Sequence, residues 1–212
     1  METLLAAAPD FRQEAELADA LLHPQDRAYS VPQLFDFIES AGLAFGRWVK
    51  QASYSPHCGV VAKIPQASRM AQLPLAEQYA AVELFRGTMV RHSVVLYRND
   101  KPGDPQPVSF AGDAWLGYVP IRMSDTICVQ ERLPPGAAAV LINQTHTYRD
   151  LFMPINATEK RWFDAIDGTR RIGEIVERTM PSSPKTSQLD AVRAFFERLW
   201  WYDQVVFDAS GS

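Results

Sequence analysis

The spacing of apolar residues predicts helices in the first part of the chain. Phe11, Ala15, Ala18 and Leu22 form one apolar stripe at helical spacing. Similar stripes recur downstream, and the predicted helices cover residues 10–22, 31–41, 66–73 and 75–86. A proline, Pro74, separates the last two, because proline cannot continue a helix across its own position. This part of the chain is therefore predicted to be mainly helical, with Ser30 and Gln33 as a capping box for 31–41.

The last part of the chain has the most regular pattern. Asn156 and Glu159 have the spacing of a capping box, which predicts a helix starting after Asn156. Two further apolar stripes begin at Ile172 and Leu189, and residues 205–207 read as a terminal strand. Three short helices followed by a strand are typical of a winged-helix-like domain.

Between these helical parts, β-branched and aromatic residues favour short strands. The predicted strands cover residues 45–51, 90–98, 108–110, 118–121, 127–131, 140–143. Six of the fifteen prolines fall between residues 102 and 135, and proline cannot donate to a strand ladder. We therefore predict an α+β fold with N-terminal helices, a small, irregular, mostly antiparallel sheet and a C-terminal winged-helix-like domain. The predicted domains are residues 1–150 and 151–212.

Composition and charge narrow the classes of function. The chain has 212 residues, 47% of them hydrophobic, and a formal net charge of −4. Residues 154–212 hold eight Lys and Arg against nine Asp and Glu, which is too acidic for the counterion release that drives DNA binding. No run of 18 apolar residues and no basic leader is present, so neither a membrane partner nor a secretory signal is expected. The two cysteines fit a reduced, cytoplasmic protein. The alternative is a single disulfide that joins them.

The segment Leu22-His23-Pro24-Gln25-Asp26-Arg27-Ala28-Tyr29-Ser30-Val31-Pro32-Gln33-Leu34 opens a longer stretch, roughly residues 10–60. This stretch resembles the region that follows the catalytic domain in bacterial class I S-adenosylmethionine-dependent methyltransferases. The resemblance implies that the segment packs on the catalytic domain and helps to shape its substrate side. It makes Asp26, Arg27 and Tyr29 candidates for facing a substrate. The alternative is a loop ion pair beside a packed tyrosine.

The family's cofactor motif has no counterpart in this sequence. None of the eleven glycines stands in a G-x-G arrangement, so no loop lets a nucleoside cofactor approach the backbone amides closely. We therefore expect this chain to hold no cofactor and no catalytic residue of the family, with S-adenosylmethionine belonging to the parent enzyme. The four histidines are not spaced as ligands on one helix face, so no metal site is expected either.

A second resemblance covers roughly residues 153–208, in which M-P-I-N-A-T-E-K-R-W-F-D-A-I-D-G-T-R-R-I-G-E-I is similar to the PqqD-like winged-helix pattern. Members of that group bind peptides along a strand edge. The resemblance implies a peptide or protein partner for this part of the chain.

Three further groups of residues are candidates for function. Arg86, Arg91 and His92 could bind an anion, or lie on a solvated strand edge. Trp201 and Tyr202 fall outside the main helical stripe and are candidates for a partner-facing patch. Cys58 with His92 could form a nucleophile and base, although no known signature flanks the cysteine and a buried hydrophobic role is the alternative.

Taken together, these patterns predict a non-catalytic accessory region of a methyltransferase, used for substrate recognition or domain docking. Its partner would be a methyltransferase catalytic domain, fused or separate. The alternative is a stand-alone protein- or peptide-interaction module.

Overall fold

The computed structural model describes residues 14–15, 28–98, 108–180 and 186–210. The chain divides into two compact units, residues 1–30 and 31–212. Apart from the helical residues 14–15, the predicted helix 10–22 lies outside the described residues, as do Asp26 and Arg27. The architecture below is therefore that of the second unit.

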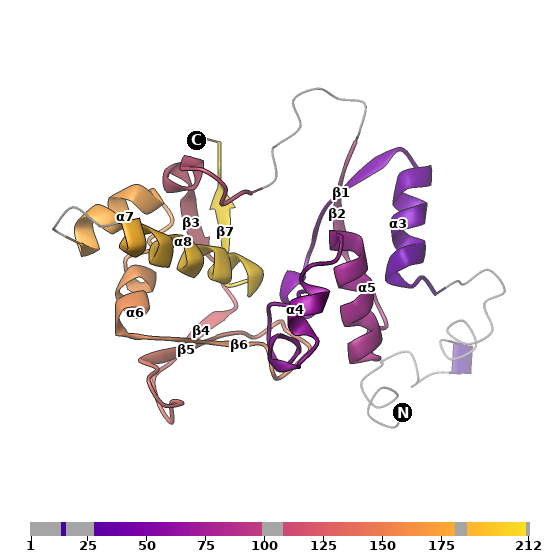
Figure 1. Ribbon diagram of the computed structural model, residues 1–212, viewed down its shortest axis with the longest axis horizontal. Helices are drawn as coiled ribbons and strands as arrows, with labels where there is room; N and C mark the ends of the chain where they lie inside the picture. The colour runs from indigo at the N-terminus through magenta and orange to yellow at the C-terminus, as the bar shows by residue number, and fades with distance from the viewer. Residues whose placement is uncertain (1–13, 16–27, 99–107, 181–185, 211–212) are drawn as a thin grey trace. The chain divides into compact units, whose positions relative to one another are not determined.

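Two helices pack beside a two-stranded antiparallel sheet in the first half of this unit (Figure 1). The helices are α3 (Val31–Ser40) and α5 (Leu75–Arg86), and the strands are β1 (Leu43–Trp48) and β2 (Val94–Arg98). Val31, Trp48, Tyr54 and Tyr79 form the buried centre of this cluster. The helix predicted over 31–41 is confirmed as α3, and Val31, Leu34 and Phe35 of its apolar stripe pack in the cluster that includes Trp48 of β1.

Short helical turns connect β1 to α5. They are the 3₁₀ helices η2 (Gln51–Ser53) and η3 (Val61–Lys63), followed by α4 (Ala67–Met70). The predicted helix 66–73 is thus shorter than expected. The predicted start of α5 after Pro74 is confirmed, and the helix ends at Gly87, whose φ of +62° suits a left-handed cap.

Two further small sheets follow, and both are antiparallel. Strands β4 (Thr126–Val129), β5 (Ala139–Asn143) and β6 (Phe152–Ile155) form one sheet in that order. Strand β3 (Val119–Arg122) follows the 3₁₀ helix η4 (Ala114–Gly117) and pairs with the C-terminal strand β7 (Val205–Asp208).

One strand prediction was wrong, and one strand was missed. Residues 108–110 do not form a strand; instead, Phe110 packs its ring against Phe207 with 5.6 Å between the ring centroids. The strand β6 was missed because Pro154 in its centre argues against a strand. Pro154 is tolerated there because β6 is an edge strand of its sheet.

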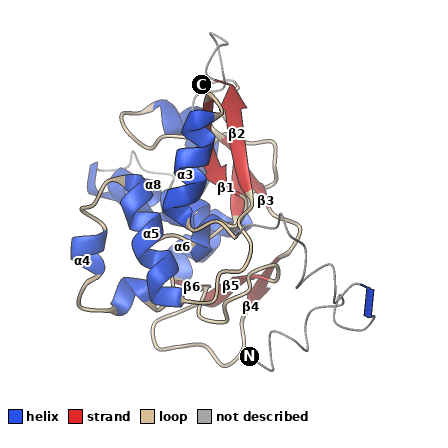
Figure 2. Cartoon of the chain, turned by 90° about the vertical axis from the view of Figure 1, so that its right-hand side faces the viewer, coloured by secondary structure: helices blue, strands red, loops and turns tan. Residues whose placement is uncertain are grey.

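The three predicted C-terminal helices are present as α6 (Ala157–Asp164), α7 (Ile172–Thr179) and α8 (Thr186–Trp201). The capping box at the start of α6 is confirmed: the Asn156 side chain accepts hydrogen bonds from two amides, and the Glu159 side chain accepts one from the Asn156 amide. Helices and strands of this kind with small antiparallel sheets make a mixed α+β fold, as the sequence predicts (Figure 2).

The largest core cluster crosses the domain boundary expected near residue 150. Phe195, Phe196 and Leu199 of α8 pack in one cluster with Trp115 and Leu141, which precede that boundary. The amide of Ile172 at the start of α7 also donates to the carbonyl of Tyr118, at 2.9 Å. These contacts do not mark a boundary near residue 150, and the division into residues 1–150 and 151–212 stays a prediction.

No helix in the described part of the chain is both long and apolar enough to cross a membrane.

Candidate functional site

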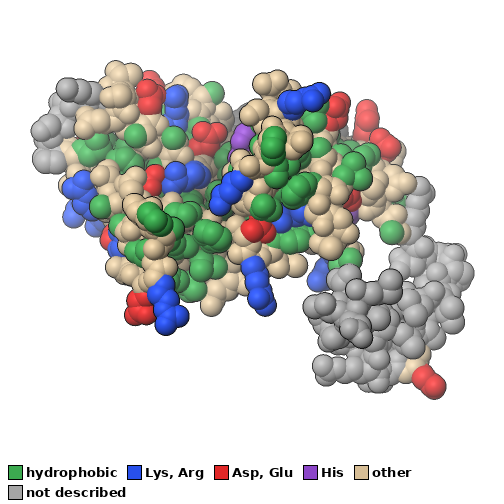
Figure 3. All heavy atoms as spheres, turned by 60° about the horizontal axis from the view of Figure 1, so that its bottom comes forward, with side chains coloured by type: hydrophobic (Ala, Val, Ile, Leu, Met, Phe, Trp, Pro, Cys, Tyr) green, Lys and Arg blue, Asp and Glu red, His purple; other side chains and the backbone are tan. Residues whose placement is uncertain are grey.

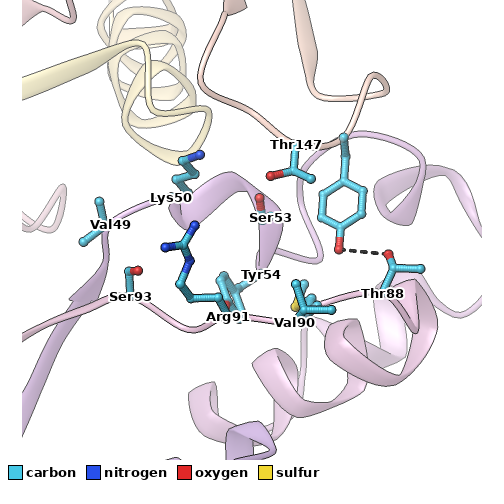
Figure 4. Close-up of a pocket in the computed structure, with 11 residues that line it drawn as sticks. Val49, Lys50, Ser53, Tyr54, Thr88, Val90, Arg91, Ser93 and Thr147 are labelled. Atoms are coloured by element: carbon cyan, nitrogen blue, oxygen red, sulfur yellow. Dashed lines mark hydrogen bonds between the residues drawn. The ribbon is translucent and has the colours of Figure 1, made fainter. Parts of the chain in front are cut away.

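Three segments that are distant in the sequence meet around a cleft of about 340 Å³ (Figure 4). The first is the corner between β1 and η2, the second is the coil between α5 and β2, and the third is the loop after β5. Together they line the cleft with Val49, Lys50, Ser53, Tyr54, Thr88, Met89, Val90, Arg91, Ser93, Thr147 and Tyr148. We refer to this site as the β1–η2 cleft.

A chain of contacts fixes the wall on which Tyr54 lies. The Tyr54 ring stacks on Trp48, with 3.8 Å between the ring centroids and 5° between the planes. The Tyr54 hydroxyl lies 2.8 Å from His92 Nδ1, and His92 Nε2 lies 3.3 Å from a Glu83 oxygen. Burial, and then the charge of Glu83, raises the pKa of Tyr54, so this phenol keeps its proton at neutral pH.

Arg86 connects two of the segments that line the cleft. Its guanidinium makes two hydrogen bonds to the Asp150 carboxylate, of 3.1 and 3.3 Å, and a third to the carbonyl of Ser53. It also lies over the Tyr148 ring, 4.0 Å from its centroid. With only 3% of its side chain exposed, Arg86 holds η2 and the loop after β5 together and is not available to a ligand.

A second buried polar group connects η2 to the end of α8. The Asp203 carboxylate accepts a hydrogen bond of 2.8 Å from the Ala52 amide and one of 3.1 Å from Arg47. His146 Nε2 lies 3.3 Å from the same carboxylate. Because buried charges are stable only when paired, this network sets the position of η2 and thus of the cleft wall.

The structure separates the predicted anion-binding residues. Arg91 lines the cleft and is exposed. His92, the next residue, does not line it and instead bonds Tyr54 from behind the wall. Tyr29 is exposed, but it belongs to the other compact unit.

Trp201 and Tyr202 are half-buried and pack on the cluster of Ala52, Cys58 and Leu151. Trp201 also lines a groove beside β7, described below. The Tyr202 hydroxyl accepts a hydrogen bond of 3.0 Å from the Gly59 amide, so its polar end is used within the chain. The reason is that the end of α8 packs on η2. This contact covers part of Trp201 and Tyr202, which the helical spacing of α8 alone leaves outside its apolar stripe.

Cys58 has the environment of a structural cysteine. It is fully buried, and its thiol lies 3.4 Å from the carbonyl of Trp201. Burial raises the pKa of the thiol, which disfavours the thiolate that a nucleophile requires. His92, the base suggested for it, is instead held by Tyr54 and Glu83. Both cysteines are free thiols.

A larger groove of about 690 Å³ borders the terminal strand β7. Val206 and Phe207 line it together with Trp200, Trp201 and Leu75. Within the described part of the chain, β7 pairs only with β3. One edge of β7 therefore has no strand neighbour among the described residues, next to an apolar groove.

Several cleft residues carried no signal in the sequence. Lys50 lies in a turn, where the sequence predicts a strand over 45–51; Ser53 lies in the 3₁₀ helix η2, and Thr147 in the irregular loop after β5. Their meeting depends on the Arg86 and Asp203 contacts, which join residues far apart in the sequence.

The β1–η2 cleft lacks two features of S-adenosylmethionine sites. The β1–η2 cleft is lined by no glycine and by no carboxylate, so it offers neither a close backbone approach nor a partner for ribose hydroxyls. All sheets of the described residues are antiparallel, whereas such cofactors bind at the ends of parallel strands. Among the described residues, no group of three or more His, Cys, Asp or Glu is placed to hold a metal ion.

Charge on the surface is mixed. On the face drawn in Figure 3, the Lys and Arg side chains of the described residues lie scattered among Asp and Glu. A comparison with the models of known protein families finds no match for this chain.

Proposed function

We propose that this chain is a non-catalytic accessory region of a class I methyltransferase, and that it recognises the substrate through the β1–η2 cleft. One observation carries the proposal: residues 49–54, at the end of the methyltransferase-like stretch, form one wall of the cleft. The resemblance implies that this stretch shapes the substrate side of the parent enzyme.

The chemistry of the cleft favours binding over bond breaking. Its polar side chains are hydroxyls, one ammonium and one guanidinium, which donate hydrogen bonds and fix orientation. General acid–base catalysis works best with a group whose pKa lies near neutral pH. Tyr54, whose pKa is raised, does not meet that requirement.

The proposal is tested with the methyltransferase catalytic domain encoded in the same or a neighbouring reading frame. We expect its methyl transfer to require this chain, or to show a markedly lower KM in its presence. Ser93→Trp fills the cleft and should remove that effect, whereas Ser187→Trp on α8 places the same side chain outside the cleft and should retain it. Equal methyl transfer with and without the chain would contradict the proposal.

Calorimetry gives an independent check. The chain alone should give no stoichiometric heat with S-adenosylmethionine, because the cleft lacks the glycine and carboxylate contacts of such sites. A micromolar affinity with one site per chain would show that the cofactor lies here and would refute the accessory role.

A second candidate function is peptide binding by strand addition at β7. The unpaired edge of β7 in the described part of the chain, beside the groove lined by Val206 and Phe207, favours it. Peptides selected on the full chain by phage display should raise the hydrogen-exchange protection of Val205–Asp208. Protection that rises only elsewhere would rule out this mode.

A further inference from the structure

The β1–η2 cleft carries an excess of positive charge. Lys50 and Arg91 both line it, and Figure 4 shows their charged ends on the same side of the cleft. Within the described residues, neither forms an ion pair with a carboxylate. The three carboxylates bonded to the walls each hold another cationic or imidazole group: Glu83 with His92, Asp150 with Arg86, and Asp203 with Arg47.

Contacts within the chain position both cations before any ligand arrives. The side-chain ammonium of Lys50 itself donates a hydrogen bond to the carbonyl of Thr145. The coil that carries Arg91 is held on its C-terminal side, where the Val49 amide donates to the Ser93 carbonyl at 2.9 Å and His92 is bonded to Tyr54. Such anchoring reduces the entropy lost when a ligand is bound.

Hydroxyl groups and apolar surface complete the site. Ser53, Ser93 and Thr147 line the cleft, and the Thr88 and Tyr148 hydroxyls lie 3.2 Å apart at its rim. The apolar part of the lining comes from Val49, Met89 and Val90. Val90 is 79% exposed, which is unusual for a valine and leaves apolar surface open beside Arg91.

From this arrangement we infer that the β1–η2 cleft binds a small organic anion, with a carboxylate or phosphate group between Lys50 and Arg91 and an apolar group against Val49 and Val90. A guanidinium can bond both oxygens of such a group, and hydroxyls supply further donors. A volume of about 340 Å³ suits a small molecule. The inference rests on the proposed role of the cleft in substrate recognition and names the chemical class of the substrate.

The test titrates the full-length chain with three probes of similar shape and follows its amide signals by NMR. Benzoate and phenyl phosphate carry an anion on an aromatic ring, and benzamide is a neutral counterpart. We expect at least one anion to shift the amides of Ser53, Ser93 and Thr147, and benzamide to bind much more weakly. Comparing the two anions distinguishes a carboxylate from a phosphate ligand.

Charge-removing variants assign the effect to the cleft. Arg91→Gln and Lys50→Gln should each weaken binding of the anion by about 10- to 100-fold, the range for one lost charged hydrogen bond. Arg178→Gln, an exposed change of the same charge on α7, serves as the matched control and should leave the affinity unchanged. Binding should also weaken as salt is added, because the site is open to solvent.

Two results would overturn the inference. Benzamide binding as tightly as benzoate, with no effect of Arg91→Gln, would show a cleft without anion selectivity; the proposed function would stand. A lack of binding by all three probes would refute the ligand class, while the methyl-transfer assay would still decide the accessory role by itself.

Discussion

Replacing Arg86 by methionine tests whether the contacts behind the cleft stabilise the fold. Methionine keeps most of the apolar length of the side chain but removes the three hydrogen bonds to Asp150 and Ser53. Breaking a buried ion pair costs about 3–5 kcal/mol, and a hydrogen bond to a charged group contributes about 1.5–3 kcal/mol. Because 29% of the Asp150 side chain is exposed, water can replace part of what is lost. We expect the free energy of unfolding to fall by about 2–4 kcal/mol.

Urea unfolding followed by tryptophan fluorescence measures this change at neutral pH, and thermal unfolding should show a fall in Tm of about 4–16 °C. Arg193→Met on α8 removes an exposed pair with Asp190 and is the control; it should cost less than about 1 kcal/mol. If Arg86→Met were as stable as this control, the reasoning would be refuted.

The same variant predicts a change with pH. Burial by itself would raise the pKa of Asp150, but the hydrogen bonds from Arg86 and the Val60 amide outweigh it and lower the pKa. A lowered pKa stabilises the fold above the pKa of the unfolded state, about 3.9, and this contribution is lost as pH falls through the folded value. The difference in the free energy of unfolding between wild type and Arg86→Met should therefore become smaller below about pH 4.

Three further predictions follow from single sites. Phe196→Ala, in the centre of the main core, should lower the free energy of unfolding by about 3–5 kcal/mol in urea titrations, whereas a loss below about 1 kcal/mol would mean that this core is loosely packed. Asn156→Ala should cost about 1 kcal/mol by the same assay, because the two amides that it caps lose their acceptor; Asn156→Ser should restore most of it. Alkylation of Cys58 by iodoacetamide at pH 8 should be slow in the native protein and fast in urea, and rapid native reaction would contradict its burial and raised pKa.

Much of the secondary structure could be predicted from local patterns. The start of α5 after Pro74 and the Asn156 cap of α6 both follow from residues close together in the sequence. Such signals work because propensity, capping and periodicity act over one or two helical turns. The same patterns failed at β6, where the edge position of Pro154 depends on a sheet whose strands lie far apart in the chain.

The candidate site could be predicted only in part. Arg91 was singled out from its position at the start of a strand pattern, and it lines the cleft. His92 was grouped with it because the two are adjacent, but neighbouring residues in an extended chain point in different directions. Trp201 and Tyr202 were expected at a surface because the pattern of one helix cannot show what packs over its end.

The amino-acid sequence by itself determined most of the described helices and several of the strands, and that no glycine-rich loop is available to a nucleoside cofactor. Only the tertiary structure decided which polar groups meet. The Arg86–Asp150 and Arg47–Asp203 pairs join residues far apart in the sequence and bury charges that must be paired. These pairs occupy the nearby carboxylates and leave Lys50 and Arg91 beside one cleft, since electrostatic pairing depends on distance in space and not on distance along the chain.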